Sequence, residues 1–241
     1  MRGFGILSTC GMEIMDWDKP YGQIIGPHKA SYEQDGKFFN RAGYEIRVGE
    51  TSKTLLFHGK RLEPYLKGEG IDIGCGTDPV ADNVQTFDLD NGDAERITEF
   101  VDRKFNFVFS SHCLEHLDNP SRVLMEWWSL VRNGGYLILI VPDEDLYEQG
   151  VWPSRFSSGH RYTFTIHKDK SWSPVSINLA GMLEKLGGDI ILLERQDDGY
   201  DYEMEASDQT AMIDNRLAQI IAVVRKSAKE GRADALLDNG N

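Results

Sequence analysis

The sequence predicts an α/β fold in which a doubly wound, mostly parallel β-sheet carries helices on both faces. Short apolar segments alternate with helical segments from residue 70 onward, which is typical of parallel strands joined by crossover helices. Some of these segments are apolar throughout, as expected of strands covered on both faces. A glycine-containing turn, Gly74-Cys75-Gly76, directly follows the first apolar segment, where sheets of this class bind their ligands.

The elements can be placed one by one along the chain. Residues 54–67 are expected to be helical in parts, with Pro64 limiting the helix. Apolar residues recur at three- and four-residue spacing over residues 120–131, which predicts a helix that Gly134 and Gly135 end. A second helix is predicted at residues 176–186. Strands are predicted at residues 70–74, 84–88, 105–110, 136–141, 189–194 and 218–224.

Length and composition indicate one main domain with extensions. The chain has 241 residues, of which 40% are hydrophobic and 27% charged, as in globular proteins. We expect residues 1–50 to form an N-terminal extension packed on the main domain, and residues 51–226 to form that domain. An insertion near residues 144–175 and a polar tail at 227–241 complete the predicted organisation.

The net charge indicates which classes of partner to expect, and the cysteine content indicates the cellular compartment. With 26 Lys and Arg against 39 Asp and Glu, the net charge of −13 repels nucleic acids and anionic membranes, so we expect neither as a partner. The three cysteines form no Cys-x-x-Cys pair, which favours free thiols in the cytoplasm. We expect a monomer or a homodimer.

The glycine turn indicates a nucleotide-containing ligand, although a tight turn without a ligand is the alternative. A dinucleotide site requires a third glycine five positions after Gly74, and Pro79 stands there. No Gly-Lys-Ser/Thr sequence follows, which excludes a P-loop. The turn is therefore expected to bind something other than NAD, FAD or a nucleoside triphosphate.

Three acidic residues around the turn indicate what that ligand contains. Asp72 can hold the amides of the turn or an ammonium group, and Asp88, at the end of the next predicted strand, can accept both hydroxyls of a ribose. Asp93 follows in a loop, where it can accept from an adenine amino group. Together these residues suit a ligand with an amine, a ribose and an adenine but no phosphate.

Five motifs then resemble those of the class I S-adenosylmethionine-dependent methyltransferases, in the order of that family. They are most like the type-11 methyltransferase domains of its small-molecule and glycan branch. The motifs lie at residues 72–76 (DIGCG), 87–90 (FDLD), 92–95 (GDAE), 107–117 (FVFSSHCLEHL) and 130–143 (LVRNGGYLILIVPD), and the resemblance covers about residues 50–226.

The resemblance implies a Rossmann-like sheet of seven strands whose last strand, at residues 218–224, runs antiparallel. It also implies S-adenosylmethionine as the cofactor. The residues that it assigns to the cofactor site are Asp72, Gly74, Cys75, Gly76, Asp88, Leu89, Asp93, Ala94, Ser110 and His112. Two features depart from the family pattern: Asp78 stands at the frequent third glycine of the turn, and the short spacing between Gly74 and Asp88 implies a truncated first helix.

The segment His112-Cys-Leu-Glu115-His116 also matches the His-x-x-Glu-His pattern of inverted zinc proteases. On a helix, both histidines would lie on one face as zinc ligands, with Glu115 as a base. The segment follows a strand at once, however, and Pro120 breaks any helix one turn later. In the resembled family, Glu-His is common at this place without a metal ion. We therefore predict that Glu115 and His116 brace a loop and that no metal is required.

The acceptor side needs a group that aligns or deprotonates the nucleophile. Histidine suits this role because its side chain titrates near neutrality, and the candidates are His112, His116 and His160. His160 lies in the predicted insertion, and in the resembled family such an insertion covers the acceptor. Alternatively, the aromatic residues of this segment only pack it: Trp152, Phe156, Tyr162 and Trp172.

From these observations we expect a methyltransferase that uses S-adenosylmethionine to methylate an oxygen or nitrogen of a small molecule or glycan. The alternatives are a methyltransferase that acts on a protein and a module that binds the cofactor without catalysis.

Overall fold

The computed structural model describes residues 31–34, 37–40, 45–46, 49–211 and 216–227. Most of the predicted N-terminal extension and of the predicted polar tail therefore lie outside the described residues. Within the extension, β1 (Ser31–Gln34), β2 (Lys37–Asn40) and β3 (Glu45–Ile46) form a small antiparallel sheet.

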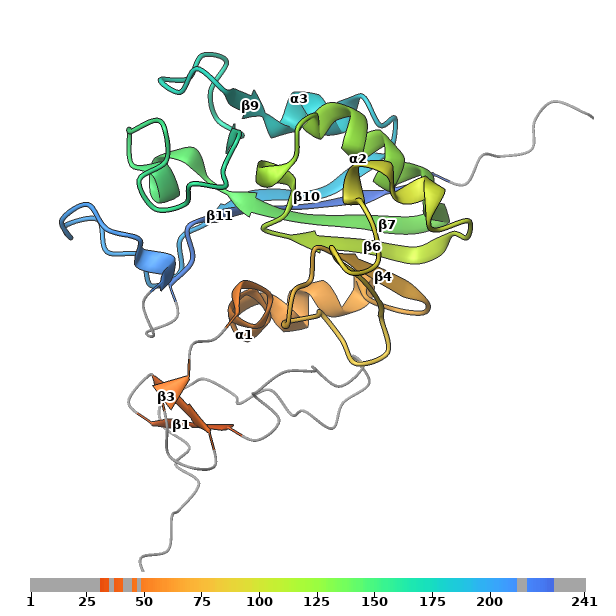
Figure 1. The fold of residues 1–241 in the computed structure, drawn as a ribbon, viewed down its shortest axis with the longest axis horizontal. Helices are drawn as coiled ribbons and strands as arrows, with labels where there is room; N and C mark the ends of the chain where they lie inside the picture. Colours follow the sequence, from red (N-terminus) through yellow and green to blue (C-terminus); the bar gives the residue numbers. More distant parts are fainter. Residues whose placement is uncertain (1–30, 35–36, 41–44, 47–48, 212–215, 228–241) are drawn as a thin grey trace, which may run out of the picture.

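The main domain is built on a six-stranded sheet with the order β10-β11-β7-β6-β4-β5 (Figure 1). The neighbours β5, β4, β6 and β7 pair in parallel, whereas β11 is antiparallel to both β7 and β10. This confirms the predicted mostly parallel sheet with an antiparallel last strand. The strands are β4 (Gly70–Ile73), β5 (Gln85–Phe87), β6 (Phe105–Ser111), β7 (Val131–Pro142), β10 (Asp189–Gln196) and β11 (Gln219–Arg225).

The expected number of seven strands is wrong, because the sheet has six strands among the residues that the structure describes. The chain between β5 and β6, residues 88–104, forms only the 3-10 helix η3 (Ala94–Glu99). A further parallel strand here would need two crossover connections, each of about a dozen residues or more. Residues 88–104 are too few for both, so β5 is the edge strand on this side of the sheet.

Helices cover both faces of the sheet, as predicted (Figure 1). α1 (Glu50–Leu62) lies on one face, while α2 (Pro120–Ser129) and α3 (Leu179–Glu184) lie on the other. Alternate residues of β7 belong to the two hydrophobic cores, one on each face of the sheet. Leu137, Leu139 and Val141 pack on the α2 side, and Ile138 and Ile140 pack on the α1 side. Full burial of each such side chain contributes about 1.5–3 kcal/mol, so β7 stabilises both layers at once.

Three helix boundaries differ from the prediction. The helix before the sheet is α1, followed by the 3-10 helix η2 (Glu63–Tyr65), whose first turn contains Pro64. α2 ends at Ser129, before the glycines, which lie within β7. The predicted helix at 176–186 is divided into β9 (Ser176–Asn178) and α3, since Asn178 accepts a hydrogen bond from Gly181 N and caps α3.

The segment after β7 forms a layer of its own around one buried carboxylate. It contains the π-helix η5 (Glu144–Glu148) and the short parallel pair of β8 (Thr163–Thr165) with β9. Glu144 is fully buried and accepts hydrogen bonds from the side chains that follow it in the segment. These donors are Thr163 Oγ1, Lys168 Nζ, Ser171 Oγ and Ser176 Oγ.

No helix in the described part of the chain is both long and apolar enough to cross a membrane.

Candidate active site

The glycine turn after β4 is open toward a ligand. Gly74 and Gly76 have φ values of +74° and +54°, in the left-handed region that favours glycine. A Cβ on Gly74 would lie 2.5 Å from Sγ of Cys113, whereas a Cβ on Gly76 would meet no atom within 4 Å. Gly74 is therefore required by the contact with the segment after β6, and Gly76 leaves space beside the backbone.

Asp72 is completely buried beneath this turn. Its Oδ2 accepts from Val80 N at 2.7 Å, which holds the far end of the turn, and its Oδ1 has no hydrogen-bond partner. Burial, together with the nearby carboxylates of Asp78 and Asp88, raises the pKa of the Asp72 carboxyl to about 8, although the hydrogen bond from Val80 N opposes the shift. A buried oxygen with a vacant acceptor position fits an ammonium group or a bound water.

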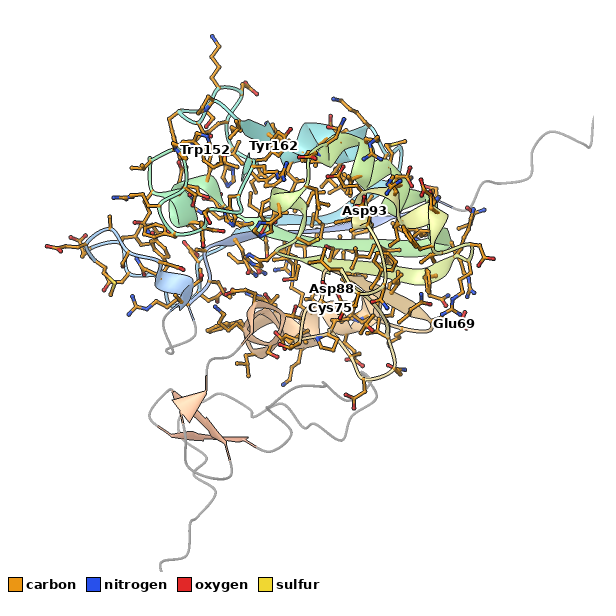
Figure 2. All side chains as sticks on the ribbon, viewed as in Figure 1. Glu69, Cys75, Asp88, Asp93, Trp152 and Tyr162 are labelled. Atoms are coloured by element: carbon orange, nitrogen blue, oxygen red, sulfur yellow. The ribbon has the colours of Figure 1, made fainter. Side chains whose placement is uncertain are left out.

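Asp88 follows β5 and faces the glycine turn (Figure 2). Gly76 N donates to its Oδ2 at 2.7 Å and Leu89 N donates to its Oδ1 at 2.7 Å. Each carboxylate oxygen retains a further acceptor position. The adjacent side chain, Leu89, is 89% exposed, so it offers apolar surface next to the turn.

Asp93 and Ala94 begin η3. Asp93 accepts from Glu95 N at 2.9 Å as the N-cap, and this hydrogen bond lowers the pKa of the Asp93 carboxyl. Ala94 O accepts from Trp127 Nε1 at 2.9 Å, which fixes the loop on α2. The side chain of Asp93 thus shapes the loop beside Asp88 in addition to any contact with a ligand.

Cys75 and Ser110 are buried. Burial raises the pKa of the Cys75 thiol to about 12, so the thiol is neutral at physiological pH. The hydroxyl of Ser110 donates to Ile73 O at 2.9 Å, which joins the ends of β4 and β6. Both side chains therefore support the turn from beneath.

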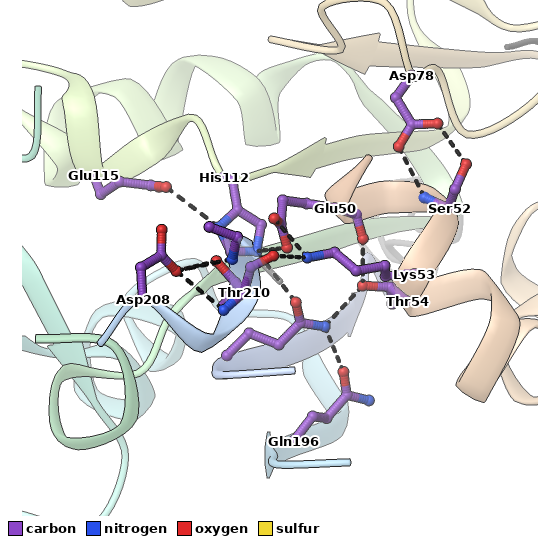
Figure 3. Close-up of polar contacts among 12 residues, drawn as sticks. Glu50, Ser52, Lys53, Thr54, Asp78, His112, Glu115, Gln196, Asp208 and Thr210 are labelled. Atoms are coloured by element: carbon purple, nitrogen blue, oxygen red, sulfur yellow. Dashed lines mark hydrogen bonds and ion pairs between the residues drawn. The ribbon is translucent and has the colours of Figure 1, made fainter. Parts of the chain in front are cut away.

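A contact that the sequence did not predict explains the departure at the third glycine of the turn. Asp78 accepts from Ser52 N at 2.9 Å and also from Ser52 Oγ (Figure 3). Ser52 lies in the first turn of α1, so Asp78 caps this helix from outside. Gly49 makes room for the contact, since a Cβ there would lie 2.1 Å from Asp78 Oδ2.

His112 follows β6 with a φ of +51°, which is uncommon for a residue with a side chain. Its backbone N donates to Ile140 O, and its ring Nε2 lies 3.1 Å from Gln219 Oε1. Gln219 Nε2 donates in turn to Thr54 Oγ1 and Gln196 Oε1, so three elements hold the His112 ring (Figure 3). This buried network fixes the orientation of the ring.

His116 and His160 meet beside Glu115. Their ring centroids are 5.0 Å apart, and His160 Nδ1 lies 2.7 Å from Oε1 of Glu148. The backbone explains the meeting, because Arg161 N and Tyr162 N both donate to Glu115 O. Glu115 and Glu148 are each 1% exposed, although both are acidic.

The structure thus brings the three histidines predicted for the acceptor side near two buried carboxylates, with His112 and His116 beside Glu115 and His160 on Glu148. His112 Nδ1 and His116 Nε2 lie 3.7 and 3.8 Å from Glu115 Oε1. Sequence reasoning missed Glu148, which has no motif around it and reaches His160 only through the fold of the insertion.

The aromatic residues of the insertion divide into two groups. Phe156 packs edge-on against Tyr147, whose ring lies 4.9 Å from that of His160, so these rings line the histidine cluster. Tyr162 OH donates to Asp118 O and Trp172 Nε1 donates to Asp145, so both serve the packing of the insertion.

The fold and the site define a Rossmann-like α/β domain with a glycine turn at the carboxyl end of β4. The sequence matches the model of a methyltransferase domain family over residues 50–187, which is more than half of the chain. The protein belongs to this family: it is an S-adenosylmethionine-dependent methyltransferase. None of the curated proteins compared with it matches.

Solved structures show similarity to the same class. A methyltransferase from Archaeoglobus fulgidus is 16% identical, with a TM-score of 0.44 over 73% of this chain and 95% of the other. One from Thermotoga maritima is 18% identical, with a TM-score of 0.42 over 75% and 100% of the two chains. The plantazolicin methyltransferase, in complex with S-adenosylhomocysteine, is 12% identical, with a TM-score of 0.45 over 74% and 86%.

The residues around the glycine turn fit S-adenosylmethionine. The vacant oxygen of Asp72, the open side of Gly76 and the exposed Leu89 offer an acceptor for an ammonium group, space for close backbone approach, and an apolar surface for a base.

Proposed function

We propose that this methyltransferase acts on an oxygen or nitrogen atom of a small molecule or glycan. The observation that carries the proposal is the position of the histidine cluster. His112, His116 and His160 lie beyond the carboxyl ends of β6 and β7, next to the glycine turn that Cys113 contacts. Acceptors of α/β enzymes bind at this edge of the sheet.

The cofactor side of the proposal rests on the residues of the turn. Asp88 would accept from the ribose hydroxyls, Leu89 would cover one face of the adenine, and Asp93 would face its amino group. Asp72, Gly74, Gly76 and Ala94 would shape the pocket, supported by the buried Cys75 and Ser110. When bound, S-adenosylmethionine supplies an electrophilic methyl group on a sulfonium.

On the acceptor side, His160 is the histidine best placed to orient or deprotonate a nucleophile. If its Nδ1–H donates to Glu148, Nε2 is left as the acceptor for a proton, as in other histidine–carboxylate pairs. The side chain of His160 is itself only 5% exposed, which limits the access of water to its ring. The net charge of −13 favours a small neutral or cationic acceptor over nucleic acid.

The test is the release of S-adenosylhomocysteine from S-adenosylmethionine across a panel of acceptors. The panel contains hydroxylated and amine-bearing small molecules, glycans, a protein extract and RNA. Turnover on a small molecule or glycan supports the proposal. Turnover confined to the protein extract or to RNA would refute it.

The variant His160→Ala links turnover to the cluster. Loss of a general base lowers the rate by about 10²–10⁴-fold, whereas loss of packing would lower the thermal midpoint and the affinity for S-adenosylhomocysteine as well. Reduced turnover with the other two readouts unchanged supports a site role. Full turnover would restrict that role to His112 and His116.

A further inference from the structure

We propose that Glu115, His116 and His160 bind a divalent transition-metal ion, with Zn²⁺ as the ion that suits them best. Each of the three residues offers one ligand atom, and these atoms lie within 4.8 Å of one another. Two imidazoles and one carboxylate are the ligands of zinc sites that keep a further position open. No other group of this kind occurs in the described part of the chain.

The burial of the Glu115 carboxyl group without hydrogen-bond partners is the first argument for a cation. The residue is 1% exposed, and neither of its carboxylate oxygens has a hydrogen-bond partner. The nearest nitrogens, on His112 and His116, lie 3.7 and 3.8 Å away, beyond hydrogen-bond distance. A buried carboxylate without partners is strongly destabilising, and a metal ion would offset that cost.

The pair of His160 and Glu148 is the second argument. Histidines that bind metal ions usually donate their other ring N–H to a carboxylate, which fixes the ring. His160 Nδ1 lies 2.7 Å from Glu148 Oε1, which leaves Nε2 as the nitrogen for the metal ion. Glu148 is itself 1% exposed, so a buried acidic side chain orients the His160 ring.

The local backbone allows the ligands to converge. A Cβ on Gly159 would lie 2.9 Å from His116 Nδ1, so the glycine gives the His116 ring its place. The side chain of His116 is 40% exposed, which provides a path for the ion. In a tetrahedral site with bonds of about 2.0–2.1 Å the ligand atoms lie about 3.4 Å apart, so side-chain rotations must draw the three ligand atoms closer together to complete the site.

This site differs from the protease-like pattern in the sequence. The sequence pairs His112 with His116 on a helix, but only the 3-10 helix η4 (Leu114–His116) forms, and Nε2 of His112 is used by Gln219. The second histidine comes instead from the insertion, which no spacing rule reveals. The sequence-based prediction that no metal is required considered only His112 and His116 as ligands, and not His160.

The position of the metal site suggests that the ion activates the methyl acceptor, an inference that rests on the proposed function. An acceptor hydroxyl or amine that took the open position would lie beyond the ends of β6 and β7, beside the glycine turn. With the ion bound, Nε2 of His160 would hold the metal and would not take the proton itself. The metal would then activate the acceptor in place of the histidine, because metal coordination lowers the pKa of a bound oxygen and orients it. Metal binding itself can be tested without cofactor or acceptor, so its failure is distinct from failure of the proposed function.

The experiment is calorimetric titration of Zn²⁺ into chelator-treated protein at neutral pH. We expect a single equivalent to bind to the wild type. His116→Ala, His160→Ala and the nearly isosteric Glu115→Gln should weaken binding at least 10–100-fold, and Glu148→Gln by about 10–100-fold. The control His167→Ala removes an exposed histidine outside the cluster and should bind as the wild type does.

Circular dichroism and S-adenosylhomocysteine binding establish that each variant is folded, and Glu115→Gln serves if the alanine variants do not fold. Failure of Zn²⁺ to bind the wild type would overturn the proposal. So would equal affinity in the wild type and in folded cluster variants, which would place the zinc elsewhere, for example on a free thiol.

Discussion

Asp88 connects the second strand of the sheet with the glycine turn through a single carboxylate. Because Gly76 N and Leu89 N already donate to it, the carboxylate is oriented before any ligand arrives. An acceptor fixed in advance loses little conformational entropy on binding. This preorganisation makes Asp88 the residue whose replacement should affect cofactor affinity most selectively.

Asp88→Ala should lower the affinity for S-adenosylhomocysteine roughly ten- to a hundred-fold, because charge-assisted hydrogen bonds contribute about 1.5–3 kcal/mol. Calorimetric titration measures the effect. Asp90→Ala, two residues further on and exposed, is the matched control and should change little. The opposite pattern, with loss only in Asp90→Ala, would assign the ribose to Asp90.

Asp72 should make stability depend on pH in an unusual direction. Burial raises the pKa of its carboxyl from 3.8 to about 8, so between these values the folded protein holds a proton that the unfolded chain has lost. The free energy of unfolding should therefore fall as pH rises from about 4 to about 8. Asp72→Asn keeps an acceptor for Val80 N but does not titrate.

The measurement is the thermal midpoint of both proteins from pH 5 to pH 8. The stability of Asp72→Asn relative to the wild type should increase along this range. Other groups, such as Asp143, whose pKa burial raises to about 6, are common to both proteins and cancel in the comparison. A difference that stays constant with pH would show that Asp72 does not titrate there.

At the scale of elements, the contact between α1 and the glycine turn should be the most sensitive junction. Gly49→Ala places a Cβ 2.1 Å from Asp78 Oδ2 and should cost about 1–3 kcal/mol, as overpacking usually does. Asp78→Gly removes the cap of α1 at a cost of about 0.5–2 kcal/mol. Urea unfolding measures each free energy.

The double variant Gly49→Ala with Asp78→Gly tests whether the two single changes act through the same contact or independently. Since Asp78→Gly removes the clashing carboxylate, Gly49→Ala should cost much less in that background, and the two changes should not be additive. Equal costs of Gly49→Ala in both backgrounds would contradict the assigned contact.

The elements also show where sequence reasoning succeeds. The strands at β4, β6, β7 and β11 were predictable because strands that are buried on both faces are mostly apolar, which leaves a clear local signal. The absence of a seventh strand was less visible, because the motif order suggested it and only the length of residues 88–104 excluded it. Similarly, a helix was expected over 176–186, where pairing with β8 makes the first residues a strand.

The candidate site shows the same division. The meeting of Asp72, Gly74 and Asp88 was predictable, because Asp72 lies near the end of β4, the other two residues directly follow β4 and β5, and parallel strands bring their carboxyl ends together. Their contact with the cofactor stays a prediction. Glu148 and Asp78 were not, because their partners, His160 and Ser52, come from segments whose placement depends on tertiary hydrogen bonds. Local sequence carries no signal for such contacts.

At the scale of the whole molecule, the two halves of the site belong to one rigid edge. β4, β6 and β7 are neighbours in the sheet, and the glycine turn, His112 and the insertion follow them in that order. A Cβ on Gly74 would lie 2.5 Å from Cys113 Sγ, so the glycine turn packs against the segment between His112 and Glu115. A ligand at this edge touches segments from both sides of the fold and should stabilise the native state as a whole.

S-adenosylhomocysteine should therefore raise the thermal midpoint of the protein, and NAD should not. A ligand at a hundred times its Kd stabilises the folded state by about 2.7 kcal/mol, and each kcal/mol shifts the midpoint by about 2–4 °C in a domain of this size. A shift of about 5–11 °C with S-adenosylhomocysteine is therefore expected in a thermal denaturation scan. NAD should give no shift, because Pro79 stands where a dinucleotide site needs glycine. The same ligand concentration should give a smaller shift in Asp88→Ala. A shift with NAD and none with S-adenosylhomocysteine would mean that the glycine turn binds a dinucleotide after all.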